Sequence, residues 1–400
     1  MTDATYQPAP TGKQYEVVLS GKVQRIALII GIVGAVLSVV GLIVNPDRFF
    51  PAYLVAFTFY TTVSLGGLFF TLLHHTAGAT WSVVIRRGAE ALALNLPWLA
   101  LFFIPVVLGA HYLFHWSHAE AVAHDPVLQW KASYLNLGSF TVRGVVYFAI
   151  WSALALVLSW FSRAQDSDGD PIHTIRLRRI SAPAMYLFAF SITFAAFDWL
   201  MSLEPHWYST IFGVYVFVGG FLAALAFITL FYLWLGRRGR LTELVGLEHY
   251  HDLGKLIFAF TVFWAYIGGS QYFLIWYANI PEETVWYLQR WTGSWKAVSL
   301  VIIFLHFMFP FLALIFYRSK RNFNVLLTVA GALLSMHYLD MYWLVMPTFS
   351  ASGATFSWID LATVAGMGGL LLWRFLDRFG RAAAVPFNDP LFPQSVEHRL

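Results

Sequence analysis

The chain has 400 residues, of which 59% are hydrophobic and 12% are charged, and its formal net charge is +4. Soluble domains carry charge on about a quarter of their residues, so this composition excludes an ordinary soluble protein and indicates a membrane protein with many spans. The chain has no cysteine, which excludes cysteine-ligated iron–sulfur clusters, covalent c-type haem and disulfides. Its basic residues lie in short loops, so the small net positive charge does not indicate nucleic-acid binding.

Residues 1–19 lack the apolar core of a signal peptide and predict a polar tail. The ten apolar runs that follow are each long enough for a bilayer span of about 20 residues. They predict helices over 25–44, 52–74, 89–113, 141–161, 181–203, 211–235, 254–278, 296–317, 323–345 and 357–376. We therefore expect an all-α polytopic membrane protein with an N-terminal tail (1–24), a transmembrane domain (25–376) and a C-terminal tail (377–400).

Two of the predicted loops are longer than the others, at 115–140 and 162–180. The second contains an acidic turn, Asp166 to Asp170, which is too short for an EF-hand and lacks its terminal Glu, so it predicts a solvated loop without metal.

If the N-terminus is inside, 20 of the 25 Lys and Arg residues fall on the inner side and 5 on the outer side. The positive-inside rule then places both tails in the cytoplasm.

Two aspartates lie at the outer ends of apolar runs, and each is followed seven residues later by a proline. They are Asp198, which precedes Pro205, and Asp340, which precedes Pro347. An ionised carboxylate inside a span is costly, so it normally has a partner or a task. The alternative is that each proline only ends its helix and each aspartate is a satisfied packing group.

The chain repeats weakly with a period of four helices. Three pairs of motifs match in order, with offsets of 160, 155 and 142: Tyr112-x3-Trp116 with Tyr272-x3-Trp276, Gly138-Ser139-Phe140 with Gly293-Ser294-Trp295, and Asp198-x6-Pro205 with Asp340-x6-Pro347. A shift of four helices preserves orientation, so the repeats are parallel. This predicts two four-helix bundles, formed by helices 2–5 (about 52–203) and helices 6–9 (about 211–345), with helices 1 and 10 peripheral.

Titratable residues inside or beside the spans are sorted by depth. The predicted proton-transfer groups are Asp198, His337, Asp340 and Asp360 toward the outside, His306 near the midplane, and Glu90, His75 and Asp252 toward the inside. Polar residues in spans are functional candidates, and histidine relays protons near neutral pH. The alternatives are packing between helices and, for the inner histidines His74, His75, His249 and His251, simple contact with interfacial water.

No helix carries the matched histidine pairs of a dihaem cytochrome b, and only His306 and His337 have the depth that a haem–copper oxidase would need. We therefore expect no haem and no metal site in this chain.

The predicted bundles, the run Phe197-Asp198-Trp199-Leu200-Met201, the following Glu204-Pro205-His206-Trp207 and the continuation Ile211 to Tyr215 resemble the NrfD-like, polysulfide-reductase C-type membrane subunits. Within that family the chain is most similar to the F-type subunits of alternative complex III, a bacterial quinol:electron-acceptor (cytochrome c) oxidoreductase. The resemblance covers about 180–345 well and the first half more loosely. It implies a multi-pass inner-membrane subunit without its own redox cofactor, which contributes proton translocation and leaves room for a quinone.

The resemblance also implies partners: a sister quinol-oxidising membrane subunit, a periplasmic iron–sulfur subunit and multihaem cytochrome subunits. The first bundle shows no deep histidine beside a tyrosine or aspartate, so the chain is not expected to oxidise quinol alone. A stand-alone secondary transporter and a cofactor-free scaffold subunit remain the alternatives. The type of quinone and the final electron acceptor cannot be read from the sequence.

Overall fold

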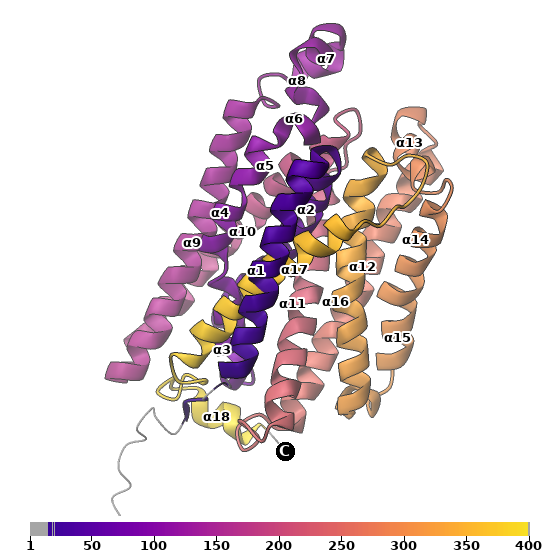
Figure 1. Ribbon diagram of the computed structural model, residues 1–400. Coiled ribbons are helices and arrows are strands. Elements are labelled where there is room, and N and C mark those ends of the chain that lie inside the picture. The colour runs from indigo at the N-terminus through magenta and orange to yellow at the C-terminus, as the bar shows by residue number, and fades with distance from the viewer. Residues whose placement is uncertain (1–14, 18, 20, 399–400) are drawn as a thin grey trace, which may run out of the picture.

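The structure is a computed structural model that describes residues 15–17, 19 and 21–398. It confirms the predicted fold class, because ten helical segments in this part of the chain are long and apolar enough to cross a membrane. They lie side by side in one bundle (Figure 1). Most of the predicted N-terminal tail, residues 1–14, 18 and 20, lies outside the described residues.

Most spans are single helices: α1 (Gly21–Val44), α2 (Pro46–Ala77), α9 (Leu137–Asp168), α10 (Ile172–Trp199), α11 (Phe212–Arg237), α12 (Leu247–Ala278), α16 (Phe323–Val345) and α17 (Trp358–Gly380). Two spans are segmented. The third consists of α3 (Val83–Ala93), α4 (Leu96–Phe102), α5 (Ile104–Leu108) and α6 (Ala110–Leu113), and the eighth of α14 (Trp295–Ile302), the π-helical η4 (Ile303–Met308) and α15 (Phe309–Leu314). The connections contain η2 (His115–Ser117), α7 (Ala119–His124), α8 (Pro126–Lys131), η3 (Met201–Leu203), α13 (Pro281–Gln289), η5 (Ser319–Arg321), η6 (Met346–Thr348) and α18 (Phe392–Glu397).

The described N-terminal and C-terminal residues meet at the same end of the bundle. Tyr15 stacks on Phe387 with ring centroids 5.4 Å apart, and Glu16 pairs with Ala383 in one antiparallel bridge. α18 lies at this end, whereas α7, α8 and α13 lie at the opposite one (Figure 1). Following the charge-based orientation, we call the α18 end the inner end and the other the outer end.

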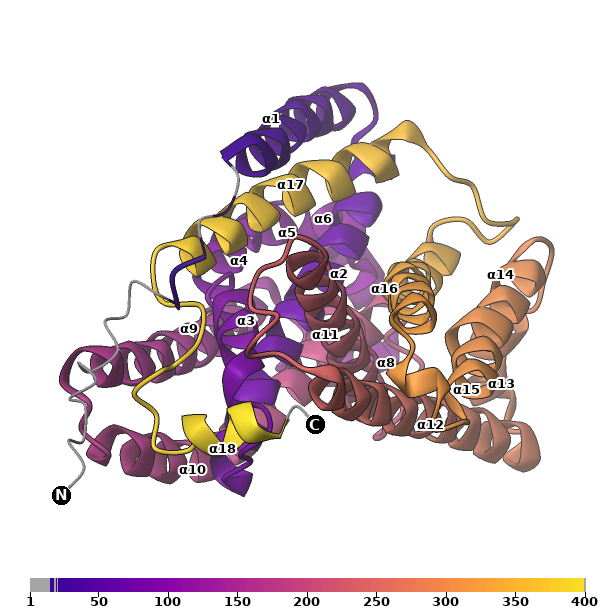
Figure 2. The ribbon, with the colours of Figure 1, turned by 90° about the horizontal axis from the view of Figure 1, so that it is seen from below.

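α2 and α11 form the centre of the bundle, with the other helices around them (Figure 2). In the most apolar stretch of 18 residues, 89% of the residues of α2 and 78% of those of α11 are buried. Both helices are therefore apolar on all faces. A Cβ atom on Gly66 would lie 2.4 Å from the Ala224 Cβ, and one on Gly220 would lie 2.7 Å from the Thr62 Cβ. Glycine at these two positions therefore allows the two backbones to pack closely.

α1 and α17 pack against each other, with α1 on the outside of the bundle and α17 between α1 and α2 (Figure 2). A Cβ atom on Gly34 would lie 2.3 Å from the Gly366 backbone nitrogen, and one on Gly369 would lie 2.3 Å from the Gly31 nitrogen. Van der Waals packing of small residues therefore holds α1, whose remaining surface is largely exposed.

The predicted loop over 162–180 is wrong. α9 continues as a helix to Asp168 and α10 begins at Ile172, so only a short turn remains, and Gly169 ends α9 in the left-handed conformation with φ 66°. Hydropathy marks only the part of a helix that crosses the apolar layer, and the polar extensions of α9 and α10 continue beyond it. The longer loop over 115–140 is also partly helical, because it contains η2, α7 and α8.

Candidate functional site

Asp198, near the end of α10, is fully buried and fully paired. The Arg143 guanidinium donates to both carboxylate oxygens, each at 2.8 Å, and the Tyr147 hydroxyl donates to Oδ2 at 2.8 Å. Arg143 and Tyr147 are four residues apart on α9 and therefore share one face of that helix. The first aspartate motif is thus a bidentate ion pair between α9 and α10.

Asp340, on α16, is also 0% exposed but lacks a cationic partner among the described residues. The Tyr215 hydroxyl, on α11, donates to Oδ1 at 2.6 Å. The second carboxylate oxygen, Oδ2, has no hydrogen-bond partner in the described part of the chain. The two aspartates that look alike in the sequence therefore have different environments.

The predicted repeat suggests why the two environments differ. Aligning Gly138 with Gly293 places Val298 and Ile302 where the first bundle has Arg143 and Tyr147. Neither aliphatic side chain can donate a hydrogen bond, and Ile302 instead lines a cavity. The cation that pairs with Asp198 thus has no counterpart beside Asp340, whose phenol donor, Tyr215, comes from α11 instead.

His306 lies in the π-helical segment η4 and is 0% exposed. Pro310 follows four residues later. A proline has no N–H for the carbonyl four residues before it, and its ring collides with that carbonyl, so it favours a local widening of the helix at His306. The imidazole packs on Trp264 with ring centroids 4.2 Å apart, and both of its nitrogens lack a hydrogen-bond partner among the described residues.

His337, one turn before Asp340, is 0% exposed and faces α2 and α11. Its Nε2 lies 2.8 Å from the Thr62 hydroxyl, which donates its own proton to the carbonyls of Thr58 and Phe59. When the Thr62 hydroxyl donates to one of these carbonyls, Nε2 carries the hydrogen and Nδ1 is the unprotonated acceptor of the neutral ring. Nδ1 has no partner in the described residues, and a Cβ atom on Gly219 would lie 3.2 Å from it.

A cavity of about 570 Å³ lies beside these groups, between α12, α13, α14, η4 and α16. Tyr215 and Trp264 line the cavity, and the hydroxyl of Tyr215 is the group that donates to Asp340. Tyr272 and Trp276, which are 50% and 60% exposed, belong to its lining on the outer surface of α12. The cavity thus connects the apolar exterior of the bundle with the donor of Asp340.

The polar groups of the cavity lie toward its outer end. The Gln271 amide donates to the Tyr287 hydroxyl at 2.9 Å, and burial raises the pKa of Tyr287 to about 12. Arg290 is 1% exposed and donates to the carbonyls of Trp343 and Leu344 at 3.3 and 3.0 Å. Burial lowers the pKa of Arg290 to about 10, so the guanidinium keeps its proton at neutral pH.

Arg290 also joins the two predicted repeats. Its Nη2 donates to Glu204 at 3.2 Å, and the Thr348 hydroxyl donates to the same carboxylate oxygen at 3.0 Å. Glu204 belongs to the segment that follows Asp198, whereas Thr348 follows Asp340. The sequence did not single out Arg290 as a functional residue, and Tyr215 entered only at the end of the family motif. The available signal was a single arginine in the connection between the seventh and eighth spans.

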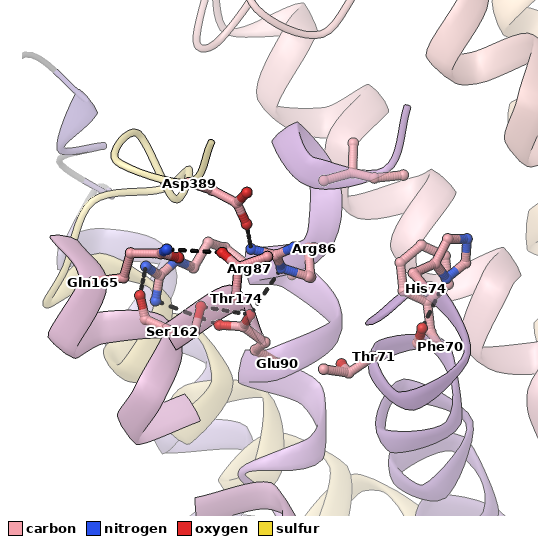
Figure 3. A network of polar contacts seen from close by, with 12 residues as sticks. Phe70, Thr71, His74, Arg86, Arg87, Glu90, Ser162, Gln165, Thr174 and Asp389 are labelled. Atoms are coloured by element: carbon pink, nitrogen blue, oxygen red, sulfur yellow. Dashed lines mark hydrogen bonds and ion pairs between the residues drawn. The ribbon is translucent and has the colours of Figure 1, made fainter. Parts of the chain in front are cut away.

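Glu90 lies in a closed network at the inner end of the bundle (Figure 3). Arg86 and Arg87 donate to it at 3.3 and 3.4 Å, and the Ser162 hydroxyl donates at 2.8 Å. Arg86 also binds Asp389 at 2.6 Å, and Arg87 also binds Asp166. Asp166, predicted to lie in a solvated loop, is therefore part of the ion-pair network that joins α3, α9 and the C-terminal segment.

The inner histidines are more buried than contact with interfacial water would allow. His74 and His75 are 6% and 5% exposed, and His249 is 0% exposed. His74 Nδ1 lies 2.7 Å from the Phe70 carbonyl, and His249 Nε2 lies 3.0 Å from the Ser395 carbonyl in α18. Burial and these contacts favour packing between helices over the alternative of water contact for these three histidines. His75 Nε2 has no partner among the described residues.

The remaining predicted residues are engaged at the two ends of the bundle. Asp252 binds Lys255 and lies 2.8 Å from His398 Nε2 near the inner end. Asp360 binds Arg48 and accepts the Ser357 backbone N–H at 2.7 Å, as the third residue of a capping box on α17. The structure thus brings His306, His337 and Asp340 together near Trp264 and Tyr215 and places Asp198, Glu90, Asp252 and Asp360 in ion pairs elsewhere. His75 lies apart from both groups, at the inner end of α2.

The fold and these buried groups define the chain as a polytopic α-helical membrane protein with an interior cluster of titratable side chains. Neither a scan against protein-family models nor a search of curated proteins finds a match to the chain.

Proposed function

We propose that the chain is a membrane subunit of a respiratory quinol:electron-acceptor oxidoreductase of the alternative complex III type, similar to its F subunit, that carries protons and no redox cofactor of its own. One observation carries the proposal. His306, His337 and Asp340 are 0% exposed in the second bundle, and each has a nitrogen or oxygen atom without a hydrogen-bond partner among the described residues.

A buried polar atom without a partner costs about 1–3 kcal/mol, so a cluster of them needs a compensating role. Imidazole can accept a proton at one nitrogen while it donates from the other, and a carboxyl group can hold or release one. His337 and Asp340 lie on the same face of α16, and the rings of His306 and Tyr215 both pack on Trp264. These groups are suited to pass protons through the second bundle.

The cavity provides the space that such a relay requires. Its volume of about 570 Å³ exceeds the roughly 30 Å³ that one water occupies in the liquid, so it has room for several waters. The same volume lies within the range of small-molecule sites, about 300–1,000 Å³. Aromatic walls with a few polar groups, among them Tyr215 and Gln271, suit a quinone ring, which we place here as the second part of the proposal.

Asp198, in contrast, is given a structural role. Its carboxylate is neutralised by Arg143 in a bidentate pair and has no open oxygen. Asp360 and Glu90 are also held in ion pairs. We therefore place the proton path at His306, His337 and Asp340 among the eight predicted residues. His75 also has an unpartnered nitrogen, but it lies at the inner end of α2, apart from this cluster.

The test uses the intact membrane complex that contains this chain, reconstituted in liposomes. Asp340→Asn should assemble and should lower the number of protons released per electron, whereas electron transfer measured with an uncoupler should fall much less. Asp377→Asn, which removes an acidic side chain paired with Arg381 at the inner end, is the matched control and should change neither quantity. A normal proton-to-electron ratio in Asp340→Asn would contradict the relay.

Co-purification in mild detergent separates the alternatives. The proposal expects iron–sulfur and multihaem cytochrome subunits to accompany the chain from the bacterial inner membrane, with both of its termini in the cytoplasm. A secondary transporter would purify alone and retain its activity. A scaffold subunit would bring the same partners, but Asp340→Asn would then leave proton release unchanged.

A further inference from the structure

Three arginines near the inner end of the bundle have no carboxylate partner among the described residues. They are Arg163 on α9 and Arg374 and Arg378 on α17, and the Nε atom of each is buried without a hydrogen-bond partner. Arg163 donates only a long hydrogen bond of 3.3 Å, to the Arg378 carbonyl. Arg374 lies over the Trp98 ring, 4.9 Å from its centroid. The inner ends of α9 and α17 are therefore joined by a patch of positive charge.

The neighbouring carboxylates are already engaged with other arginines. Arg86 and Arg87 hold Glu90, Asp166 and Asp389 in the network of Figure 3. Farther along α17, Arg381 holds Asp377 at 2.8 Å. None of these carboxylates forms an ion pair with the patch. Glu90 and Asp166 near Arg163, and Asp377 near Arg374, balance its charge only in part, because they are shared with Arg86, Arg87 and Arg381.

The patch lies at the inner boundary of the membrane. Arg163 and Arg378 follow the apolar stretches 141–161 and 357–376 by two residues each, and Arg374 lies in the last turn of the second stretch. A cation in the apolar layer normally pairs with an anion or reaches toward the head groups of the lipid. Beside the patch, Trp160 on α9 and Leu372 on α17 are 62% and 39% exposed. They give the surrounding surface the apolar character that acyl chains contact.

We propose that this patch binds one anionic glycerophospholipid of the inner leaflet. The three guanidinium groups of Arg163, Arg374 and Arg378 donate hydrogen bonds to its phosphate, and its acyl chains lie along the exposed apolar faces of α9 and α17. Charge complementarity and position favour a lipid over a soluble anion, because the arginines lie at the inner ends of two spanning helices beside exposed apolar side chains. Guanidinium groups bind phosphate oxygens with charge-assisted and bidentate geometry.

Native mass spectrometry of the purified full-length chain tests this site. We expect one phosphatidylglycerol to remain bound to the wild type in mild detergent. Each arginine near a membrane surface contributes attraction worth about a fivefold change in affinity, so Arg374→Gln with Arg378→Gln should weaken binding roughly 30-fold. Arg381→Gln is the matched control, because Arg381 lies on the same helix end but is paired and 64% exposed, and it should retain the lipid.

A second measurement keeps the proposal testable if the double variant does not fold. The wild-type chain in nanodiscs of phosphatidylcholine should gain thermal stability when phosphatidylglycerol is added, and the gain should diminish at high salt. The proposal would be overturned if the double variant retained the lipid as well as the wild type, or if Arg381→Gln lost it as the double variant does. It would also be overturned if phosphatidylglycerol gave no gain in stability. So would an equal gain from inorganic phosphate alone, which would identify a site for a soluble anion.

Discussion

The pairing of Asp198 with Arg143 predicts a loss of stability when either partner is removed. Asp198→Asn keeps the size of the side chain but leaves the Arg143 guanidinium without its anion. Breaking a buried ion pair costs about 3–5 kcal/mol, and because the Arg143 side chain is 20% exposed we expect the lower end, about 3 kcal/mol. The loss should be seen as a lower melting temperature of the detergent-purified chain.

A double-mutant cycle distinguishes the ion pair from general damage to the helix contact. Replacing both partners, with Arg143→Met and Asp198→Asn, removes the uncompensated charge and should recover much of the stability that either single variant loses. Proton release by the assembled complex should change little in the double variant. If Asp198→Asn were as stable as the wild type but deficient in proton release, Asp198 would be a proton carrier and our assignment of the two aspartates would be wrong.

Three further predictions concern the periphery. Gly34→Leu should detach α1 from α17 and expose α1 to proteolysis, whereas Gly21→Leu, where a Cβ atom meets nothing within 4 Å, should not. Burial acts to raise the pKa of Asp125, but backbone N–H groups of α8 donate to it and hold the pKa below its ordinary 3.8. That stabilisation is present at neutral pH and is lost as the pH falls below 3.8, so hydrogen exchange of α7 and α8 should accelerate there. Reporter fusions after Arg238 should be cytoplasmic and those at Pro281 periplasmic, and the reverse pattern would refute the orientation.

Much of the architecture could be predicted from the sequence because a bilayer imposes one-dimensional rules. A span needs a long apolar run, and the flanking arginines bias its orientation, so all ten spans were found from hydropathy alone. The same rules could not find the polar ends of α9 and α10, because hydropathy carries no information about a helix outside the membrane.

The environments of the buried groups were decided by tertiary structure. Asp198 and Asp340 have the same local pattern, and what distinguishes them is the side chain that a separate helix presents: Arg143 from α9 to the first, and Tyr215 from α11 to the second. A local pattern shows that a carboxylate is buried. Its partner depends on long-range contacts, because Arg143 lies 55 positions from Asp198 and Tyr215 lies 125 positions from Asp340. Only the packed bundle therefore showed that Asp198 is neutralised and that Asp340 keeps an open oxygen.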